Sequence, residues 1–517
     1  MARYNLTTAI PYVNGRPHIG HALELVQADV LARHRRRLGD EVRFQSGTDD
    51  NALKNVRAAE AEGITTAAYV ERAATGFHQL KDVLDLSFDD FIRTSSDKRH
   101  RPGVEELWRR CQHDLYRKAY QGLYCVGCER FYEPADLTPQ GTCEEHGTKP
   151  EVVEEENWFF RLSSYSDQLY DLIESGRLRI EPASRKREVL AFIQSGLDDF
   201  SASRSTTRAR GWGIPVPGDP DQVIYVWYDA LANYITAPGF GTDPDRYEHW
   251  WNASERVHVI GKGIIRFHAV YWPAILLSAG LTLPDVIYVH EYLTANGEKI
   301  SKTAGNAVDP ADLVARYGPD AVRWWLLSDV ARAGDTDFTV ERLIARANED
   351  LANNLGNLVH RTVSLLHRYR GGAVPPGQTN EAVRLRQARA AAGTAVATAL
   401  DEFDFRRAVE AITTIGREGN RFVEAVRPWD LAKSGADAQL DAVLAELVDA
   451  CRDIGEHLVP FLPAAAARIA AQCTGEVEPR PVFPRLEASP RPTRPVRLRV
   501  RAEFRHSGRP GHPAQRC

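Results

Sequence analysis

Residues 9–23 read Ala9-Ile10-Pro11-Tyr12-Val13-Asn14-Gly15-Arg16-Pro17-His18-Ile19-Gly20-His21-Ala22-Leu23, and they carry the chain from a predicted strand into a predicted helix. The preceding segment, residues 4–10, is apolar and β-branched, which is typical of a buried strand. Apolar residues then recur at helical spacing, Pro17 suits a first helical turn, and Gly39 is a typical C-cap. We therefore predict a helix over about residues 18–38.

Two histidines, His18 and His21, lie three residues apart and so share one face of the first helical turn. Gly20 between them lets a ligand approach the backbone closely. A helix N-terminus after a tight turn attracts anions, because unpaired N–H groups and the helix dipole point at the ligand. The segment predicts a phosphate site. Taken alone, its plain alternative is a chance pattern with one buried histidine.

A second basic segment is the loop Lys299-Ile300-Ser301-Lys302-Thr303, which follows the turn-former Asn296-Gly297. Two lysines flanking a serine can reach a polyphosphate and neutralise it, whereas an isolated basic loop is usually solvated surface. The two segments together, in this order, are far more specific than either one alone.

The strand predicted after the helix, residues 41–45, leads towards Asp49. Two strands joined by a helix form a right-handed parallel unit, and such sheets bind ligands beyond the carboxyl ends of their strands. Asp49 is therefore placed to bind a substrate ammonium group, with a helix cap as the alternative. The lack of a Gly-x-Gly-x-x-Gly sequence in this stretch disfavours a dinucleotide site.

The composition is that of a globular protein with several domains, with 517 residues, 43% hydrophobic and 26% charged. Its net charge of −5 means that any nucleic acid has to be held by local basic patches. We find no apolar run long enough for a bilayer and no signal-peptide pattern, and the seven cysteines do not form a disulfide framework. We therefore expect a cytoplasmic protein without a membrane partner.

Residues 113–220 interrupt the α/β pattern and contain two short-spaced pairs of soft metal ligands. The pairs are Cys125 with Cys128 and Cys143 with His146. This spacing suits a tetrahedral Zn²⁺, and four protein ligands leave no open position, so the metal is predicted to be structural. The alternative is four unrelated residues.

After residue 221, strand-like runs at 223–228 and 257–263 restore the α/β pattern. A stripe of aromatic residues follows. Aromatic residues this closely spaced usually belong to the hydrophobic core, but several residues in this part of the chain and near residue 10 lie at predicted strand ends or helix starts and can line an apolar pocket. These pocket candidates are Ile10, Tyr12, Trp227, Tyr234, Ile264, His268 and Trp272. From about residue 341 the chain reads as a helical bundle, with helical stretches at 345–371, 381–402, 405–427 and 438–473 and a break around 430–436.

Over residues 1 to about 487 the chain resembles the methionyl-tRNA synthetases, which are class I aminoacyl-tRNA synthetases. Beyond the two phosphate segments and the Cys/Cys/Cys/His knuckle, the resemblance rests on Pro11-Tyr12-Val13-Asn14-Gly15, Gly47-Thr48-Asp49, Glu156-Asn157-Trp158-Phe159-Phe160, Trp212-Gly213-Ile214-Pro215-Val216-Pro217, Tyr225-Val226-Trp227-Tyr228-Asp229-Ala230, and Phe267-His268 ahead of Tyr271-Trp272-Pro273-Ala274. It implies an α/β fold in which a Rossmann-like parallel-sheet catalytic domain is split by a zinc-knuckle insertion and followed by an α-helical anticodon-binding bundle.

The implied domains follow from this pattern. They are the two catalytic halves at 1–112 and 221–290, the insertion at 113–220, a lysine-loop and stem-contact region at 291–340, the helical bundle at 341–487, and an Arg- and Pro-rich tail at 488–517 that we expect to be disordered.

The resemblance implies ATP-dependent activation of methionine to methionyl-adenylate and transfer to the 3′ end of tRNA(Met). It assigns ATP to His18, Gly20, His21, Lys299, Ser301 and Lys302, with Mg²⁺ on the pyrophosphate, and makes the two histidines and two lysines catalytic. It assigns the methionine side chain to the seven pocket candidates, the amino group to Asp49, one structural Zn²⁺ to the knuckle, and the anticodon to Asn357, Arg361 and Trp429. Some members carry a further C-terminal dimerising domain that this chain lacks, so we expect a monomer.

The chain also departs from the family pattern. Gly263 stands where many members have aspartate after Gly-Lys, and Asn51-Ala52 replaces a frequent His-Gly. One alternative is a paralogue that passes methionine from the adenylate to an acceptor outside translation. Two others are a tRNA-binding regulator with an inactive site, which the intact phosphate segments disfavour, and a leucyl-, isoleucyl- or valyl-tRNA synthetase, which needs a larger insertion than residues 113–220.

Overall fold

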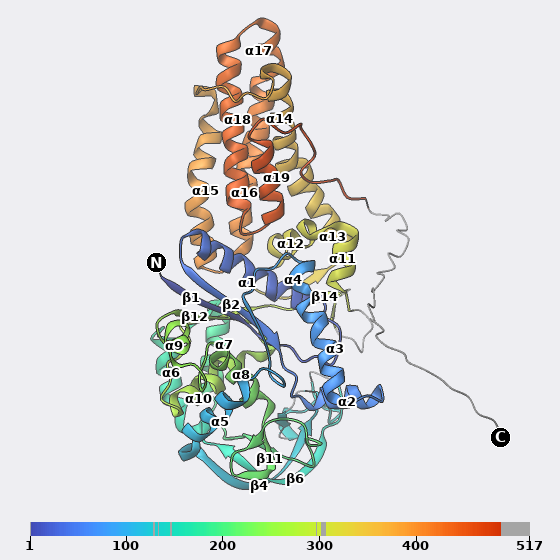
Figure 1. Ribbon diagram of the computed structural model, residues 1–517, viewed down its shortest axis with the longest axis vertical. Helices are drawn as coiled ribbons and strands as arrows, with labels where there is room; N and C mark the ends of the chain where they lie inside the picture. Colours follow the sequence, from blue (N-terminus) through green and yellow to red (C-terminus); the bar gives the residue numbers. More distant parts are fainter. Residues whose placement is uncertain are drawn as a thin grey trace, which may run out of the picture.

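The computed structural model describes residues 2–127, 130–132, 134–144, 147–295, 297–300 and 307–487. Its centre is a six-stranded parallel sheet in the order β3-β2-β1-β12-β13-β7 (Figure 1). The strands are β1 (Arg3–Thr8), β2 (Glu41–Thr48), β3 (Asp90–Arg93), β7 (Arg179–Glu181), β12 (Glu255–Gly261) and β13 (Val286–His290). The strand order reverses between β1 and β12, which opens a crevice at their carboxyl ends, where such sheets bind ligands.

Helix α1 (Ile19–Arg37) joins β1 to β2, close to the predicted bounds. His18 is its N-cap, so Pro17 precedes the helix and does not lie in its first turn as predicted. The other helices of this half of the molecule are α2 (Leu53–Ala61), α3 (Thr66–His78), α4 (Leu80–Val83), α5 (His100–Arg110), α8 (Val226–Thr236), α9 (Pro244–Tyr247) and α10 (Trp272–Ser278).

The strand predicted over residues 223–228 is wrong in its second half. Strand β11 (Asp219–Ile224) ends before Tyr225, and α8 begins at Val226. Every residue of α8 except Trp227 is buried. A helix that is buried on almost all sides has no exposed polar face to give a helical period, so its sequence looks like that of a buried strand.

Residues 113–224 build two small antiparallel sheets, in the orders β5-β4-β6-β8 and β10-β11-β9, so the second sheet extends past the predicted boundary at 220. They also supply β7, which pairs in parallel with β13, so the insertion is joined to the main sheet. The elements are β4 (Leu115–Cys125), β5 (Arg130–Tyr132), β6 (Glu151–Phe160), β8 (Phe200–Ser201), β9 (Ser203–Ser205), β10 (Pro215–Val216), α6 (Ser166–Glu174) and α7 (Ala183–Gln194).

A short region connects the main sheet to the bundle. It contains a three-stranded sheet in the order β15-β14-β16. Along the chain, α11 and α12 lie between β15 and β16, and α13 follows β16. The elements are β14 (Leu293–Ala295), β15 (Glu298–Lys299), α11 (Pro310–Tyr317), α12 (Pro319–Ser328), β16 (Thr336–Phe338) and α13 (Val340–Arg346).

The C-terminal helices form a bundle that extends away from the sheet, with α17 at its far tip (Figure 1). After a π-helical segment at 347–356 come α14 (Asn357–Arg370), α15 (Val383–Asp401), α16 (Phe405–Val426), α17 (Pro428–Ser434), α18 (Asp437–Leu458) and α19 (Pro463–Gln472). The predicted stretch 438–473 is therefore two helices, because Pro463 starts a new one. The break predicted around 430–436 is mostly helix α17.

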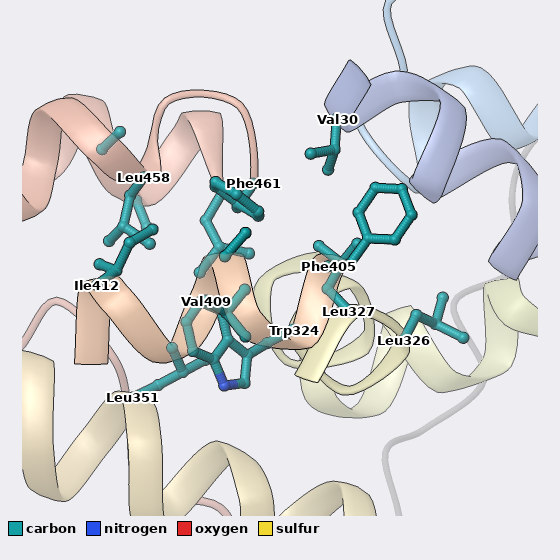
Figure 2. Close-up of a cluster of buried hydrophobic side chains, with 14 of the residues drawn as sticks. Val30, Trp324, Leu326, Leu327, Leu351, Phe405, Val409, Ile412, Leu458 and Phe461 are labelled. Carbon is teal, nitrogen blue, oxygen red and sulfur yellow. The ribbon is translucent and has the colours of Figure 1, made fainter. Parts of the chain in front are cut away.

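One hydrophobic core runs from the main sheet into the bundle. Val30 of α1, Trp324 of α12, Phe405 of α16 and Phe461 before α19 lie close together in it (Figure 2). Among the described residues, no helix combines the length and apolar character needed to cross a lipid bilayer.

Candidate active site

The two histidines of the first helical turn cap the helix that carries them. The N–H of Gly20 donates to Nδ1 of His18 (3.1 Å), and the N–H of His18 donates to Nδ1 of His21 (3.0 Å). Since both Nδ1 atoms accept, the proton of each neutral ring is on Nε2. The rings stack with centroids 3.8 Å apart, and both line a large cleft. The pair therefore presents Nε2–H donors, with both tautomers fixed by the backbone.

Position 20 requires glycine for a steric reason, in addition to the close approach of a ligand that we predicted. A Cβ at this position would lie 2.9 Å from Cε1 of His18. A larger residue would therefore push the His18 ring out of its capping position. The requirement for glycine comes from the histidine two residues earlier, which sequence spacing alone did not reveal.

The cleft has a volume of about 1080 Å³ and opens at the carboxyl ends of β1, β2 and β12. Its wall includes Ala9, Ile10 and Tyr12 after β1, Ser46 and Gly47 in β2, and Gly261 and Gly263 at the end of β12. The strand order reverses at this position, which is where an open parallel sheet binds its ligand.

Four of the seven pocket candidates line this cleft, namely Ile10, Tyr12, Trp227 and Ile264. The rings of Tyr12 and Trp227 meet edge to face with centroids 6.2 Å apart. Behind Trp227, Phe267 stacks on it at 3.9 Å with the two planes nearly parallel, at 4°. We did not single out Phe267 from the sequence, although it belongs to the aromatic stripe that we recognised.

The other three candidates, Tyr234, His268 and Trp272, are buried behind this wall. Nδ1 of His268 donates to the carbonyl of Ile264 (2.9 Å), so its Nε2 accepts from the hydroxyl of Tyr234 (2.7 Å). Burial lowers the pKa of His268 to about 4, which keeps the ring neutral. The pair therefore acts as a fixed, uncharged support for the residues that line the cleft.

His258 is a support that sequence reasoning missed. The indole N–H of Trp272 donates to its Nε2 (3.3 Å), which leaves the proton on Nδ1, 2.6 Å from the hydroxyl of Thr7. Burial lowers the pKa of His258 well below its ordinary value. Thr7 is 251 positions away in the chain, so no local pattern could have indicated this pairing.

Asp49 lies at the carboxyl end of β2 with 1% of its surface exposed. Its N–H donates to the carbonyl of Pro11 (2.9 Å), and a bridge joins it to Tyr12. Its carboxylate accepts the N–H of Asn51 (3.1 Å), whose side-chain amide donates to Asp229 (2.7 Å). Asn51, a departure from the family pattern, thus ties the Asp49 turn to helix α8.

The other departure from the family pattern, Gly263, lies directly against the side chain of Tyr292. A Cβ at residue 263 would lie 1.7 Å from the hydroxyl oxygen of Tyr292, and both residues line the cleft. No side chain fits at position 263 while Tyr292 holds this place. Nearby, Nε2 of His290 lies 3.0 Å from the carboxylate of Glu24, whose pKa is raised by burial. This part of the wall is therefore polar and closely packed.

One described residue of the lysine loop lies at the same cleft. Ile300 lines the cleft, and the N–H of Ile19 donates to the carbonyl of Val308 (2.9 Å). The chain beyond the loop therefore contacts the start of α1. Ser301, Lys302 and Thr303 lie outside the described residues, and of Lys299 only the backbone is described, in β15.

The knuckle borders the cleft as well. Tyr124, Val126, Gly127, Thr148, Lys149 and Glu151 line it. Cys125 and Cys143 are 1% and 0% exposed and share a small cluster with Tyr132, whose hydroxyl lies 3.3 Å from the Cys143 sulfur. Cys128 and His146 lie outside the described residues. The two described thiols, from separate segments, are thus brought together.

A second hollow, of about 590 Å³, lies in the bundle and is lined by Asn357 and Arg361. Nδ2 of Asn357 donates to Oδ1 of Asn420 (2.9 Å), and Arg361 pairs with Glu424 (2.7 Å). The guanidinium of Arg361 also lies 5.9 Å from the ring centroid of Trp429. The three residues suggested for base recognition are therefore neighbours. Sequence reasoning missed two further cations that line the hollow, Arg417 and Arg421.

A family model described as "tRNA synthetases class I (M)" matches residues 4–145 and 132–363. The methionine--tRNA ligase of Brucella suis is 42% identical over 475 residues, 90% of this chain and 91% of that protein, and that of Fusobacterium nucleatum is 38% identical over 90% of this chain and 74% of that protein. The structure of Mycobacterium tuberculosis methionyl-tRNA synthetase in complex with methionyl-adenylate superposes with a TM-score of 0.87 at 39% identity, covering 91% and 93% of the two chains.

Proposed function

This chain belongs to the class I tRNA synthetases and, within them, to the methionine--tRNA ligases, and from that premise we propose that it activates methionine with ATP and transfers it to tRNA(Met). The observation that carries the proposal is the single cleft at the strand reversal, lined by His18, His21 and Ile300. The histidine segment and the lysine loop, remote in sequence, both approach it.

In the first step a carboxylate oxygen of methionine attacks the α-phosphorus of ATP. The P–O bond to the β-phosphate breaks, pyrophosphate leaves, and methionyl-adenylate forms. In the second step a hydroxyl of the tRNA's terminal adenosine attacks the acyl carbon and AMP leaves. The first step needs little proton transfer, so catalysis depends on positioning and on stabilisation of charge at the phosphates.

We assign the α-phosphate to the Nε2–H groups of His18 and His21, because the backbone fixes both tautomers. Backbone N–H groups at the start of α1 add further donors, with Gly20 allowing close approach. Lys299, Ser301 and Lys302 are assigned to the β- and γ-phosphates, and Mg²⁺ neutralises charge on the pyrophosphate.

The methionine side chain is assigned to the apolar wall at Ile10, Tyr12, Trp227 and Ile264, supported from behind by Tyr234, His268 and Trp272. Asp49 is assigned to the amino group. An apolar pocket rejects a side chain that differs by one methylene by only about 1–3 kcal/mol, so a rigid pocket shape is needed. The neutral His268 and His258 supply that rigidity without placing charge beside the thioether.

A structural Zn²⁺ fits the knuckle, because Cys125 and Cys143, from separate segments, are buried in one small cluster and cysteine sulfur is a preferred zinc ligand. Cys128 and His146 complete the ligand set. When bound, the metal fixes the knuckle along the edge of the cleft. Metal analysis of the purified protein is expected to give one zinc per chain. Treatment with a chelator is expected to remove this zinc.

The anticodon is assigned to Asn357 and Arg361, which line the hollow in the bundle, and to Trp429 beside Arg361, because a planar guanidinium and an indole suit unpaired bases. We propose that the protein acts as a cytoplasmic monomer. Light scattering tests the monomer, and cell fractionation tests the location.

The decisive experiment measures ATP–pyrophosphate exchange with each of the twenty amino acids, followed by acylation of tRNA. Exchange with methionine and charging of tRNA(Met) are expected. Exchange without charging of any tRNA would instead identify a paralogue with another acceptor, and no methionine-dependent exchange would overturn the proposed function.

A further inference from the structure

Arg323 of α12 is a buried cation that contacts three separate parts of the chain. Its side chain is 1% exposed. Its guanidinium donates five hydrogen bonds of 2.7–3.3 Å, to the carbonyl oxygens of Leu84, Asp85, Pro460 and Phe461 and to the carboxylate of Asp29. The planar five-donor group of arginine suits such a site, which an ammonium group does not match.

The partner carboxylate, Asp29, lies in α1 and is fully buried. Besides Arg323 it accepts hydrogen bonds from the N–H and hydroxyl of Ser87 (both 2.7 Å) and from Arg33 (2.8 Å). Burial alone would raise the pKa of Asp29, but Arg323, Arg33 and Ser87 together hold it below the ordinary value. The carboxylate is thus charged and fully satisfied in the interior.

The apolar groups near this ion pair come from α1, α12 and the bundle. Val30, next to Asp29 in α1, lies beside Phe405 of α16, and Leu327 of α12 and Phe461 belong to the same cluster (Figure 2). Arg323 therefore lies where α1, α12 and the bundle meet.

Helix α1 extends from this junction to the cleft. It has 19 residues, which corresponds to a rod of roughly 28 Å. Its N-terminus carries His18 and His21, while its C-terminal residue Arg37 donates to the carbonyl of Glu456 in the bundle (2.6 Å). The N-terminal end is also anchored independently, by the Ile19 to Val308 hydrogen bond. Loss of the junction would therefore loosen the bundle and leave the start of α1 in place.

We propose that Arg323 is a positioning residue for the second step of the reaction: by joining α1, α12 and the 460–461 turn, it fixes how far and at what angle the bundle stands from the cleft. A tRNA held in the bundle hollow then presents its 3′ end at the cleft. This inference rests on the proposed function, since it concerns the charging of tRNA.

The variants Arg323→Lys and Asp29→Asn test the role. Lysine keeps the charge but cannot make five hydrogen bonds, and asparagine keeps the shape of aspartate without its charge. The matched control is Arg468→Met, which removes an exposed ion pair of 2.5 Å between Arg468 of α19 and Asp320 of α12. The control thus breaks another contact between α12 and the bundle, one whose arginine is 43% exposed.

Three activities are measured on the full chain: methionine-dependent ATP–pyrophosphate exchange, acylation of full-length tRNA(Met), and acylation of an acceptor-stem minihelix that lacks the anticodon. For both junction variants we expect kcat with full-length tRNA to fall at least tenfold. Exchange and minihelix acylation are expected to change less than threefold, and the control to resemble the wild type in all three.

A purely structural role gives a different pattern, in which all three activities fall together with the folded fraction measured by circular dichroism. That pattern, or full-length charging that stays within threefold of wild type, would overturn the inference. If Arg323→Lys does not fold, Asp29→Asn alone decides between these outcomes. A wild-type protein without methionine exchange or tRNA charging would instead refute the proposed function itself.

Discussion

The cleft and the bundle hollow hold their polar groups in opposite ways. In the cleft, His18 and His21 are fixed by backbone N–H groups, and His268 lies in a buried chain of hydrogen bonds. In the hollow, Arg361 is held by Glu424, whose side chain is 65% exposed. Chemistry at phosphorus needs groups that do not reorganise, whereas a surface that receives RNA can exchange its ion pairs for contacts with the ligand.

The largest expected effect concerns the histidines of the cleft, which are held in place by backbone N–H groups. His21→Ala removes a donor from the phosphate site and is expected to lower methionine-dependent exchange by about 100- to 1000-fold. The control is His21→Gln, because glutamine at this position of a helix can keep the capping contact. If His21→Gln has the melting temperature of the wild type but exchanges as slowly as His21→Ala, the loss of activity comes from the missing donor and not from the missing cap. Full activity of His21→Gln would contradict the assigned role.

The buried histidine gives the next effect, on stability. His268 has a pKa of about 4 in the folded protein and about 6.5 when exposed, so the unfolded chain binds the extra proton between these values. The contribution of neutral His268 to the free energy of unfolding is therefore fully present above pH 6.5, and about 3 kcal/mol of it is lost as the pH falls towards 4. Urea unfolding at pH 7 and pH 4.5 measures this loss.

The matched variants are His268→Asn and His113→Asn, the second at a side chain that is 63% exposed. The difference in unfolding free energy between the two pH values is expected to shrink in the first variant only. An unchanged difference in His268→Asn would show that the ring is not the titrating group.

The hollow gives smaller effects. Trp429→Ala is expected to raise KM for tRNA by about ten- to a hundredfold, since stacking of one base is worth about 1–3 kcal/mol, while exchange stays unchanged. Trp429→Phe keeps an aromatic face and serves as the control. A fall in exchange equal to the loss of charging would contradict the separation of the two regions.

The smallest effect concerns the exposed ion pair itself. Glu424→Gln leaves Arg361 without its carboxylate, and the expected change in unfolding free energy is below about 1 kcal/mol because the pair faces solvent. Binding of tRNA, measured by filter retention at two salt concentrations, is expected to stay equal or become tighter. Weaker binding would mean that the glutamate itself contacts the RNA.

The sequence predicted the elements whose signals are local. The strand before residue 9 and the helix after His18 followed from apolar periodicity and turn residues, and the structure places them at Arg3–Thr8 and Ile19–Arg37. The segment 226–228 was mispredicted as strand because a fully buried helix lacks periodicity. Local patterns thus identify amphipathic elements better than buried ones.

The supports of the cleft were beyond sequence reasoning for another reason. His258 is explained by Thr7 and Trp272, and Gly263 is explained by Tyr292. Each of these partners is set by the fold and not by spacing in the chain. Arg417 and Arg421 were missed because charged residues on a helix usually face solvent, and nothing local distinguishes those that border a hollow.

The contact between Gly263 and Tyr292 also constrains the evolution of this enzyme. With the tyrosine hydroxyl 1.7 Å from where a Cβ would stand, any residue with a side chain at 263 collides with it. A side chain at 263 therefore requires either that the Tyr292 ring rotates away or that position 292 changes. The tolerance of position 263 to substitution is therefore set by the room that residue 292 leaves, and we expect the two positions to vary together.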